Sequence, residues 1–528
     1  MDAVAHPEPE KIQTSKGARH SQILKIALFA TGLAGIVAEY ILSTLATYFL
    51  GDSVFQWTMV LSLMLFAMGL GSRVSKHMDT NLLEKFILAE FALSILTSFS
   101  ASLTYVAASY TDYLFILIYS TSIGIGLLIG MEIPLVMRIN NSYETLKVNI
   151  SSVMEKDYYG SLIGGLFFAF VGVPYLGLTY TPFVLGIVNF LVAVVLLYQL
   201  RELVSRTWIK PIVGLAVFIM LLLGSGVFMA KEIILYGEQK RYTDKVIYEK
   251  LTRYQQIVIT EWKNKHWLYL NNHQQLSTVD EWLYHEPLVH PVMGLSKTPF
   301  DVLVLGGGDG CAVREVLKYP QVRTITLVDL DPEMTKLGLE HPVMRAANKD
   351  ALHNPKVKIL NQDAYTFLTK SLDYFDVMII DFPDPQNADL SRLYSLEFFK
   401  LCQKQLRPQG VLITQSGSPY YAPDAFKCIE RTIASAGFNT IPIHNQVLTM
   451  GEWGWIIGAK GIAKEQLKPI LQQMTFKDIP TRWLNHDAMQ LITSFGKDLA
   501  PHNDSILVNT IHNPILHTYY NKGNWALW

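Results

Sequence analysis

Four aspartates in the second half of the chain stand at the ends of short apolar segments: Asp309, Asp329, Asp363 and Asp381. A further one, Asp384, follows Asp381 in the run Asp-Phe-Pro-Asp. Carboxylates gathered in one place attract cations, and a well-placed carboxylate can accept the proton of a reacting amine. The set therefore predicts a pocket for a polycationic ligand, although Asp384-Pro385 taken alone is also found in simple turns.

The segments that would position these acids have the pattern of an α/β domain. Short apolar runs rich in β-branched residues predict strands, and amphipathic stretches between them predict helices. The strands are expected at 300–305, 324–328, 357–360, 377–380 and 411–414, and the helices at 311–318, 395–405 and 424–436. This alternation predicts a Rossmann-like, doubly wound and mainly parallel sheet, which binds its ligands at the carboxyl ends of the strands.

The first strand runs into a glycine-rich turn, Gly306–Gly310 (GGGDG), and Asp329 ends the next strand. Gly306 and Gly308 would let the backbone approach a nucleoside cofactor, and Asp329 would accept hydrogen bonds from its ribose. The same turn serves enzymes that use NAD and enzymes that use S-adenosylmethionine. Asp309 narrows the choice of cofactor, because an acid inside the turn repels a ligand carboxylate or phosphate and attracts an ammonium group.

Two segments before this domain, 254–261 and 267–270, predict strands of a small β subdomain, and 279–293 predicts an amphipathic helix.

The composition argues against nucleic-acid-binding, disulfide-rich and metal-binding proteins. The net charge of −1 and the absence of a long basic run give no case for nucleic-acid binding. The cysteines, Cys311, Cys402 and Cys428, form neither a CxxC pair nor a His/Cys cluster, so we expect no disulfide framework and no metal site.

Half of the residues are hydrophobic, and the excess lies between Ile23 and Ala230. A helix needs ~20 apolar residues to cross a bilayer. Seven segments meet or approach that length: 23–47, 55–71, 86–108, 114–137, 158–173, 181–200 and 212–230. They predict an all-α transmembrane bundle of about seven helices, with the first helix as an anchor rather than a signal peptide.

The basic residues of this half are distributed unevenly. They cluster before the first segment and after the second, fourth and sixth, whereas the loops 51–54, 109–113 and 174–180 contain no Lys or Arg. The positive-inside rule therefore places the N-terminus in the cytoplasm. Seven crossings would then place the second half of the chain outside, yet Lys231, Lys240, Arg241 and Lys245 after the last segment favour the inside.

Three carboxylates fall within or at the edge of the predicted spans: Glu39, Glu90 and Glu132. A charge in a bilayer is costly and often functional. Glu90 and Glu132 are expected near helix ends, facing protein or water. Glu39 lies deeper in its segment and is the better candidate for a polar cavity.

Several motifs in order resemble the spermidine synthase family. Gly306–Gly310 followed by Arg314-Glu315-Val316-Leu317 is similar to its GGGDGG…REVL signature, and 280–286 (DEWLYHE) to its DExxYHE helix. Asp381–Pro385 with Leu393-Tyr394-Ser395 is similar to its D-x-x-D-P…LYS/T segment. The resemblance covers about 248–520, and the joined apolar half resembles the multi-pass membrane branch of this family.

The resemblance implies a reaction and a role for each matching residue. The co-substrate would be decarboxylated S-adenosylmethionine, with no permanently bound cofactor, and the acceptor would be the diamine putrescine. Gln255 and Asp329 would bind the nucleoside, Asp363 with Ala364 the adenine, and Asp309 the aminopropyl ammonium or a neighbouring amine. His285 and Asp384 would position the diamine, Gln275 would line the pocket nearby, and Asp381 would be the catalytic acid/base. The resemblance also implies a homodimer.

The sequence departs from the family pattern in three places. Cys311 replaces the last glycine of the turn, which we expect to change little. The segment 386–388 (QNA) stands where the family often has a proline, and a tyrosine of the later acceptor loop is missing from 450–455 (MGEWGW). Glu452 and Trp453 could replace that contact or could be plain loop and core residues. The tail 509–520 is expected to be structural.

The sequence thus predicts a polar leader at 1–21, a transmembrane bundle at 22–231, a linker with a small β/α subdomain at 232–299 and a Rossmann-like aminopropyltransferase domain at 300–528. Two alternatives remain: a methyltransferase that uses S-adenosylmethionine itself, against which Asp309 argues, and a non-catalytic polyamine-binding sensor or transporter. A multi-pass protein of the cell (inner) membrane is expected. Because the co-substrate is made in the cytoplasm, a cytoplasmic catalytic domain is favoured, against the seven-helix count.

Overall fold

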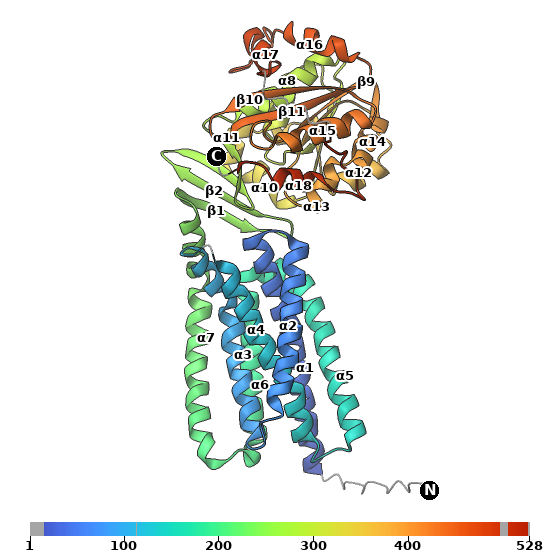
Figure 1. Cartoon of the computed structure of the whole chain (residues 1–528). Helices are drawn as coiled ribbons and strands as arrows, with labels where there is room; N and C mark the ends of the chain where they lie inside the picture. The colour runs from blue at the N-terminus through green and yellow to red at the C-terminus, as the bar shows by residue number, and fades with distance from the viewer. Residues whose placement is uncertain (1–14, 112, 497–504, 526–528) are drawn as a thin grey trace, which may run out of the picture. The chain divides into compact units, whose positions relative to one another are not determined.

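The computed structural model describes residues 15–111, 113–496 and 505–525. The chain divides into two compact units, an N-terminal unit, Met1–Lys245, and a C-terminal unit, Val246–Trp528 (Figure 1). Of the predicted polar leader, residues 1–14 lie outside the described residues, and the remainder is already helical. Each unit has its own buried core, so each is described by itself.

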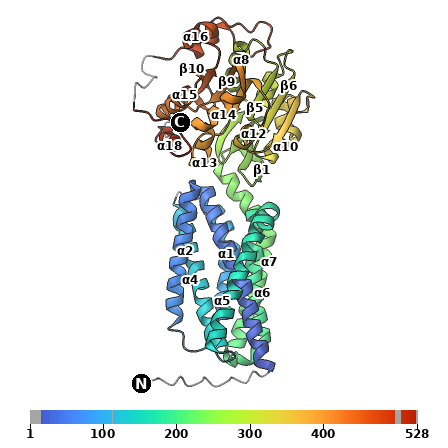
Figure 2. The ribbon, with the colours of Figure 1, turned by 90° about the vertical axis from the view of Figure 1, so that its right-hand side faces the viewer.

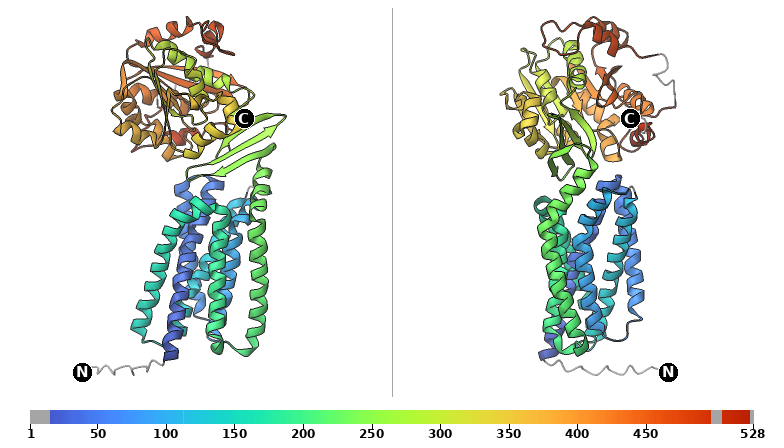
Figure 3. Two further views of the ribbon diagram at one scale, coloured as in Figure 1. Left: turned by 180° about the vertical axis from the view of Figure 1, so that it is seen from behind. Right: turned by 90° about the vertical axis from the view of Figure 1, so that its left-hand side faces the viewer.

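The N-terminal unit is a bundle of long α-helices (Figures 1 and 3). Within the described residues they are α1 (Ser15–Leu50), α2 (Ser53–Ser75), α3 (Leu82–Ala108), α4 (Leu114–Asn140), α5 (Leu146–Phe167), α6 (Gly177–Gln199) and α7 (Arg206–Arg241). A π-helical segment, Phe168–Leu176, joins α5 to α6, and a short 3-10 turn, Arg201–Leu203, precedes α7. Several helices extend beyond the predicted spans, because their polar end turns continue the helix outside the apolar stretch.

Six uninterrupted helical runs in the described residues are long and apolar enough to cross a membrane, and the longest of them, Leu146–Gln199, contains both α5 and α6. The chain folds back inside this run at Gly177, where φ is +62°. Phe168, directly after α5, packs against Tyr40 in the second half of α1, whereas Gln199, at the end of α6, bonds to Arg19 at the start of α1. The run therefore crosses the bundle twice, which gives seven crossings as predicted.

Small residues bring the helices of the bundle close together. A Cβ added to Gly130 of α4 would lie 2.1 Å from the carbonyl oxygen of Met68 in α2, and one added to Gly160 of α5 would lie 2.0 Å from that of Phe29 in α1. Such close approach is typical of helix packing in membranes. Large apolar side chains point outward, as at Phe228 of α7, which is 84% exposed. The surface suits a lipid environment.

The three acids predicted in the spans are all buried. Glu90 is 0% and Glu132 1% exposed, and Glu39 is 9% exposed. Glu90 and Glu132 therefore face protein, and they are the most deeply buried of the three. Glu39, the acid predicted to lie deeper along its span, is the most exposed of the three.

The C-terminal unit begins with a four-stranded antiparallel sheet of sequential strands, β1 (Lys245–Leu251), β2 (Gln256–Trp262), β3 (Lys265–Leu270) and β4 (His273–Ser277). The two later hairpins turn at Lys263-Asn264 and Asn271-Asn272, where all four residues have positive φ. Asparagine tolerates that conformation well, so these tight turns are encoded locally. The helix α8 (Trp282–Leu295) follows, close to its predicted position.

The main sheet has seven strands in the order β10-β11-β9-β8-β5-β6-β7. Figure 2 labels β5, β6, β9 and β10 among them. They are β5 (Asp301–Gly306), β6 (Thr324–Asp329), β7 (Val357–Asn361), β8 (Phe375–Asp381), β9 (Leu406–Gln415), β10 (Asn439–Val447) and β11 (Gly451–Ala459). The strands β5 to β9 pair in parallel, and β10 and β11 add an antiparallel edge. The strand order reverses between β5 and β8, the point at which such sheets bind ligands.

Helices cover both faces of this sheet. They include α9 (Cys311–Val316), α10 (Pro332–Glu340), α11 (Pro342–Asn348), α12 (Ala364–Lys370), α13 (Ala388–Ser391), α14 (Leu396–Gln405), α15 (Pro423–Ser435), α16 (Lys464–Gln472), α17 (His486–Ile492) and α18 (Leu516–Asn521). Successive residues of β5 enter different cores: Val302 and Val304 pack with α8 and α9, and Leu303 and Leu305 pack with α12, α14 and α15. Parallel pairing of β5 with β8 places their carboxyl ends, Gly306 and Asp381, side by side.

Candidate active site

A cavity of about 330 Å³ opens at the carboxyl ends of the parallel strands. Every site residue predicted from the sequence lines it: Gln255, Gln275, His285, Gly306, Gly308, Asp309, Asp329, Asp363, Ala364, Asp381 and Asp384. They come from the small sheet, from α8 and from the ends of β5, β6, β7 and β8. The fold therefore brings together residues that are spread over about a quarter of the chain.

The glycine-rich turn after β5 is shaped by two close approaches. Gly306 has φ +78°, and a Cβ there would lie 2.1 Å from the carbonyl oxygen of Asp381. A Cβ on Gly308 would lie 2.7 Å from Oδ2 of Asp329, which accepts the Gly308 backbone N–H at 3.0 Å. Side chains at either position would separate the strand ends, so the turn requires glycine for packing as well as for access.

Asp329 lies at the end of β6 and accepts a second backbone N–H, that of Asp331, at 2.9 Å through Oδ1. Burial raises the pKa of Asp329 to about 6, although these two hydrogen bonds act in the opposite direction. Gln255 hydrogen-bonds to the neighbouring aspartate, Asp331. Its Nε2 donates to Oδ2 of Asp331 at 3.1 Å, and the Thr252 hydroxyl donates to the same oxygen at 2.8 Å. Asp331 is thus a pocket residue that sequence analysis missed.

Asp363 caps helix α12. Its Oδ1 accepts the backbone N–H and the hydroxyl of Thr366, both at 2.8 Å, and its Oδ2 pairs with Nη2 of Arg392 at 2.8 Å. Ala364 begins the helix beside it. This edge of the cavity therefore presents a small side chain and a carboxylate whose oxygens already have donors.

Asp381 ends β8 at the centre of the cavity. The Tyr284 hydroxyl donates to its Oδ1 at 2.7 Å. One carboxylate oxygen of Asp381, one of Asp309 and a ring nitrogen of His285 all lie within 4.8 Å of one another. Burial, together with the charge of Asp309, raises the pKa of Asp381 to about 6, while His285 and Tyr284 moderate the rise. A carboxylate with a pKa near neutrality is suited to general base catalysis.

Asp384 is buried and is held by two side chains from distant segments. Tyr520 of α18 donates its hydroxyl to Oδ2 at 2.7 Å, and Gln415 at the end of β9 donates Nε2 to Oδ1 at 3.2 Å. Burial raises the pKa of Asp384 to about 6, against these two hydrogen bonds. The tail, which was expected to be structural, thus supports a pocket residue through Tyr520.

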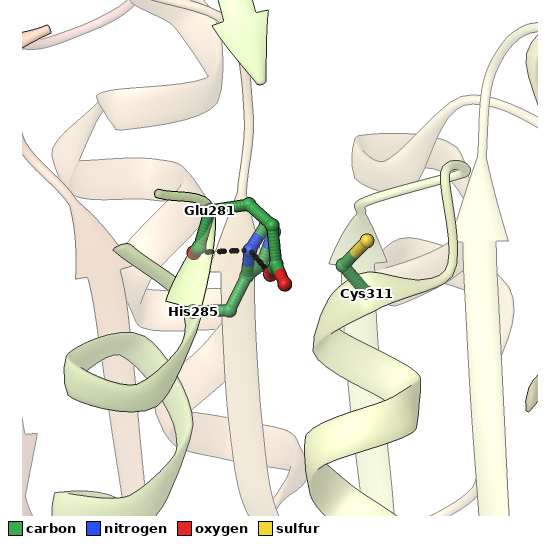
Figure 4. Close-up of side chains that lie close together, drawn as sticks. All are labelled: Glu281, His285 and Cys311. Carbon is green, nitrogen blue, oxygen red and sulfur yellow. Dashed lines mark hydrogen bonds and ion pairs between the residues drawn. The ribbon is translucent and has the colours of Figure 1, made fainter. Parts of the chain in front are cut away.

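His285 is fixed from its own helix. Its Nδ1 lies 2.9 Å from the carbonyl oxygen and 3.1 Å from Oε2 of Glu281, one turn earlier (Figure 4). Burial alone would lower the pKa of His285, but Glu281, Asp309 and Asp381 together raise it to about 9. Figure 4 also shows Cys311, at the start of α9, without a bond to either residue.

The later acceptor loop contributes Met450 and Trp453 to the cavity lining. Glu452 does not contribute, because it pairs with His444 on the neighbouring strand β10. Of the two residues left open by the sequence, Trp453 therefore belongs to the pocket and Glu452 does not. Alternation along β11 separates them, since successive strand residues face opposite sides.

Three groups of His, Cys, Asp or Glu in the described residues are close enough to hold a metal ion. In two of them, other partners already occupy the carboxylates. Arg314 pairs with both oxygens of Glu281 at 2.9 and 2.7 Å. Glu286 accepts the backbone N–H groups of residues 482–484, and Glu315 pairs with Arg314 and Lys318. The third group is the His285, Asp309 and Asp381 cluster at the cavity centre.

Comparison with known proteins defines the class of this fold and site. A family model described as the spermine/spermidine synthase domain matches residues 281–468. Polyamine aminopropyltransferase 2 of Aquifex aeolicus is 42% identical over 95% of this chain and 99% of its own length. The polyamine aminopropyltransferase of Leptospira interrogans is 38% identical over 94% of this chain and 98% of its own. A crystal structure of spermidine synthase in complex with the transition-state analogue AdoDATO aligns at 26% identity, covering 48% of this chain and 86% of that chain, with a TM-score of 0.44.

Identity of this extent over nearly the whole length includes the helical bundle as well as the α/β unit. The chain belongs to the polyamine aminopropyltransferases. It is an enzyme of the spermidine synthase type, which transfers an aminopropyl group rather than a methyl group.

Proposed function

We propose that this enzyme transfers the aminopropyl group of decarboxylated S-adenosylmethionine to putrescine, giving spermidine and methylthioadenosine. The observation that carries this proposal is the grouping of His285, Asp309 and Asp381 within 4.8 Å in a cavity that also contains Asp384. Three acids in so small a space suit a ligand pair with several positive charges. A ligand with a carboxylate beside Asp309 would be repelled.

The two ends of the cavity have different chemistry. Asp329 and Gln255 line the end nearest the glycine-rich turn, and they bind the ribose and its surroundings. Asp363 and Ala364 accept the adenine beside the start of α12. Gln275, His285 and Asp384 orient the diamine, and Asp309 holds the aminopropyl ammonium. Trp453 and Met450 supply apolar contacts for the methylene chain of the acceptor.

The reaction is a substitution at carbon. The lone pair of one acceptor nitrogen attacks the aminopropyl carbon attached to the sulfonium, and the carbon–sulfur bond breaks with its electrons passing to sulfur. The leaving thioether is neutral, so no oxyanion needs stabilising. Asp381 takes the proton from the attacking amine as general base, and Tyr284 orients Oδ1 of Asp381 from 2.7 Å. The acids on either side hold amine and electrophile in line.

A product assay tests this proposal on the purified full chain with decarboxylated S-adenosylmethionine and putrescine. We expect spermidine and methylthioadenosine in equal amounts. Asp381→Asn keeps the shape of the residue and removes the base, so we expect a loss of about 10²- to 10⁴-fold in kcat. Absence of product with putrescine, but turnover with a longer or shorter amine, would overturn the acceptor assignment. Absence of product with every amine would overturn the reaction.

The bundle embeds the enzyme in a lipid bilayer, and we infer the cell (inner) membrane as its location. The near-neutral net charge supports no interaction with nucleic acid.

A homodimer is part of the proposal, and the mass of the detergent-solubilised protein measured by light scattering tests it. A monomeric mass at working concentrations would contradict the dimer.

Two arguments give opposite orientations of the bundle in the membrane. Because seven crossings place Ser15 and Arg241 at opposite ends, the N-terminus and the catalytic unit cannot both be cytoplasmic. Supply of the charged co-substrate favours a cytoplasmic catalytic unit, and the basic loops favour a cytoplasmic N-terminus. Fusions of a cytoplasm-active fluorescent protein and of a periplasm-active phosphatase to each terminus decide between them, since only one pair of signals is compatible with each orientation.

A further inference from the structure

Glu281 is a buried acid to which the proposed reaction gives no role. It lies at the start of α8. Arg314 of α9 donates a hydrogen bond to each of its carboxylate oxygens, from Nη1 to Oε1 at 2.9 Å and from Nη2 to Oε2 at 2.7 Å. Both side chains are 8% exposed. Arg314 is fixed in turn by Glu315, whose Oε1 accepts its Nε–H at 2.8 Å. Bidentate pairing of this kind fixes the plane of a carboxylate.

The fixed carboxylate faces His285. The Nδ1 of His285 meets two acceptors of Glu281, the backbone carbonyl and Oε2, and neither of them can donate a hydrogen. Nδ1 must therefore carry a proton. A ring nitrogen of the same imidazole lies within 4.8 Å of carboxylate oxygens of both Asp309 and Asp381. The imidazole thus lies close to three carboxylates, those of Glu281, Asp309 and Asp381.

The charges around His285 come from every element packed on it. Glu281 lies on its own helix, Asp309 on the turn after β5 and Asp381 at the end of β8. Arg314 lies behind Glu281, and Cys311 lies at the start of α9. The Tyr284 ring meets the imidazole edge-on, with centroids 5.1 Å apart. Three carboxylates against one guanidinium favour the doubly protonated, cationic imidazole, in keeping with its raised pKa of about 9.

We propose that Glu281, locked by Arg314, is a positioning residue that keeps His285 charged and turned toward Asp309 and Asp381. The imidazolium offsets the repulsion between these two acids and keeps Asp381 ionised, so that it can act as the base at neutral pH. His285 itself gives up no proton in the reaction. This inference rests on the proposed function, because it assigns the control of the base in that reaction.

Glu281→Gln removes the charge and keeps the size of the side chain. An opposite charge nearby shifts a carboxyl pKa by roughly 1–3 units, so loss of the imidazolium should move the acid limb of kcat/KM upward by about one unit. We expect about a twofold lower kcat/KM than the unaltered enzyme near pH 7, where the imidazole of the variant has lost a proton, and almost no difference near pH 8.5. In the His285→Gln background, Glu281→Gln should produce no further shift, since it acts only through His285.

Glu286→Gln is the matched control. Glu286 lies on the same helix and is fully buried, but it accepts backbone N–H groups of residues 482–484 on the other side of α8. We expect Glu286→Gln to have a lower Tm than the unaltered enzyme, with the acid limb of its kcat/KM profile at the same pH. If Glu281→Gln does not accumulate as folded protein, Arg314→Lys replaces it in the test. This variant keeps the positive charge but loses the bidentate hydrogen bonds to Glu281, so it should move the acid limb of the kcat/KM profile upward by a smaller amount.

A second readout does not depend on turnover. In protein labelled with ¹⁵N-histidine, the His285 resonances are identified by their loss in His285→Gln. We expect both ring nitrogens to be protonated near pH 7.5 in the unaltered chain, and one to be unprotonated in Glu281→Gln. A neutral ring in the unaltered chain, or an unmoved acid limb in folded Glu281→Gln, overturns this inference. Absence of turnover in the unaltered chain overturns the proposed function alone.

Discussion

Buried acids occur in both halves of this molecule, but their surroundings differ. In the pocket, Asp381 accepts a hydrogen bond from Tyr284, and Asp384 accepts one each from Tyr520 and Gln415. In the bundle, neither oxygen of Glu90 has a hydrogen-bond partner among the described residues, and the same is true of Oε1 of Glu132. Burial alone therefore does not distinguish a site. The distinguishing feature of the pocket acids is that donors from separate elements orient them toward a common cavity.

The largest expected effect beyond the loss of the base concerns the acceptor. Asp384→Asn removes the charge that faces the diamine, and a hydrogen bond to a charged group contributes about 1.5–3 kcal/mol. We expect the KM for putrescine to rise roughly 10- to 100-fold, with a much smaller change in the KM for decarboxylated S-adenosylmethionine. Steady-state kinetics with each substrate varied in turn measures both constants.

Asp389→Asn is the control for charge at the pocket, because Asp389 also lines the cavity but is exposed to solvent. Its KM for putrescine should change by less than about twofold, as expected for a screened surface charge. Equal effects of the two substitutions would mean that overall charge, rather than an oriented carboxylate, recognises the diamine.

The pH dependence of the reaction should reflect the raised pKa of Asp381, about 6. The base works only when ionised, so its protonation as the pH falls through about 6 should lower kcat/KM, by about tenfold per unit well below that point. A profile measured from about pH 5 to 8 under saturating co-substrate gives the midpoint. A flat profile over this range, as expected for an exposed aspartate with a pKa of about 4, would contradict the buried environment described for Asp381.

The difference between the two regions also explains which features could be predicted from the sequence. The glycine-rich turn and the acids at strand ends are local patterns, because a strand end and the loop after it are adjacent in the chain. The long apolar helices of the bundle follow from hydrophobic length alone. The partners of the acids are not local: Tyr284 is 97 residues from Asp381, and Tyr520 is 136 residues from Asp384.

Other differences have the same physical origin. The hydrogen bond from Gln255 to Asp331 could not be predicted, because it joins the loop after β1 to the start of α10, 76 residues further along the chain. Glu452 and Trp453 could not be separated before the register of β11 was known.

Tyr520→Phe tests the contribution of the distant partner. The phenylalanine keeps the ring, which stacks with Trp525 at 4.6 Å, and removes one donor to Asp384. We expect the free energy of unfolding to fall by about 1 kcal/mol, and the KM for putrescine to rise a few-fold as Asp384 loses its orientation. Tyr420→Phe, at a residue that is 55% exposed, should change neither quantity. An unchanged KM in Tyr520→Phe would show that Gln415 alone suffices to hold the carboxylate.

The smallest effect on catalysis is expected from the bundle. Glu90→Met replaces an unpartnered, fully buried carboxyl with an apolar side chain of similar size, which is often neutral or stabilising by about 1 kcal/mol. Glu144→Met is the matched control, since Glu144 is also buried but pairs with Lys25 at 2.6 Å and accepts the Ser21 hydroxyl at 2.9 Å. We expect Glu144→Met to lower the Tm of the detergent-solubilised protein and Glu90→Met to leave it unchanged or raise it, both with kcat within about twofold of the unaltered enzyme. A fall in Tm or in kcat for Glu90→Met would mean that Glu90 has a partner beyond the described residues, and the contrast between the two groups of acids would no longer hold.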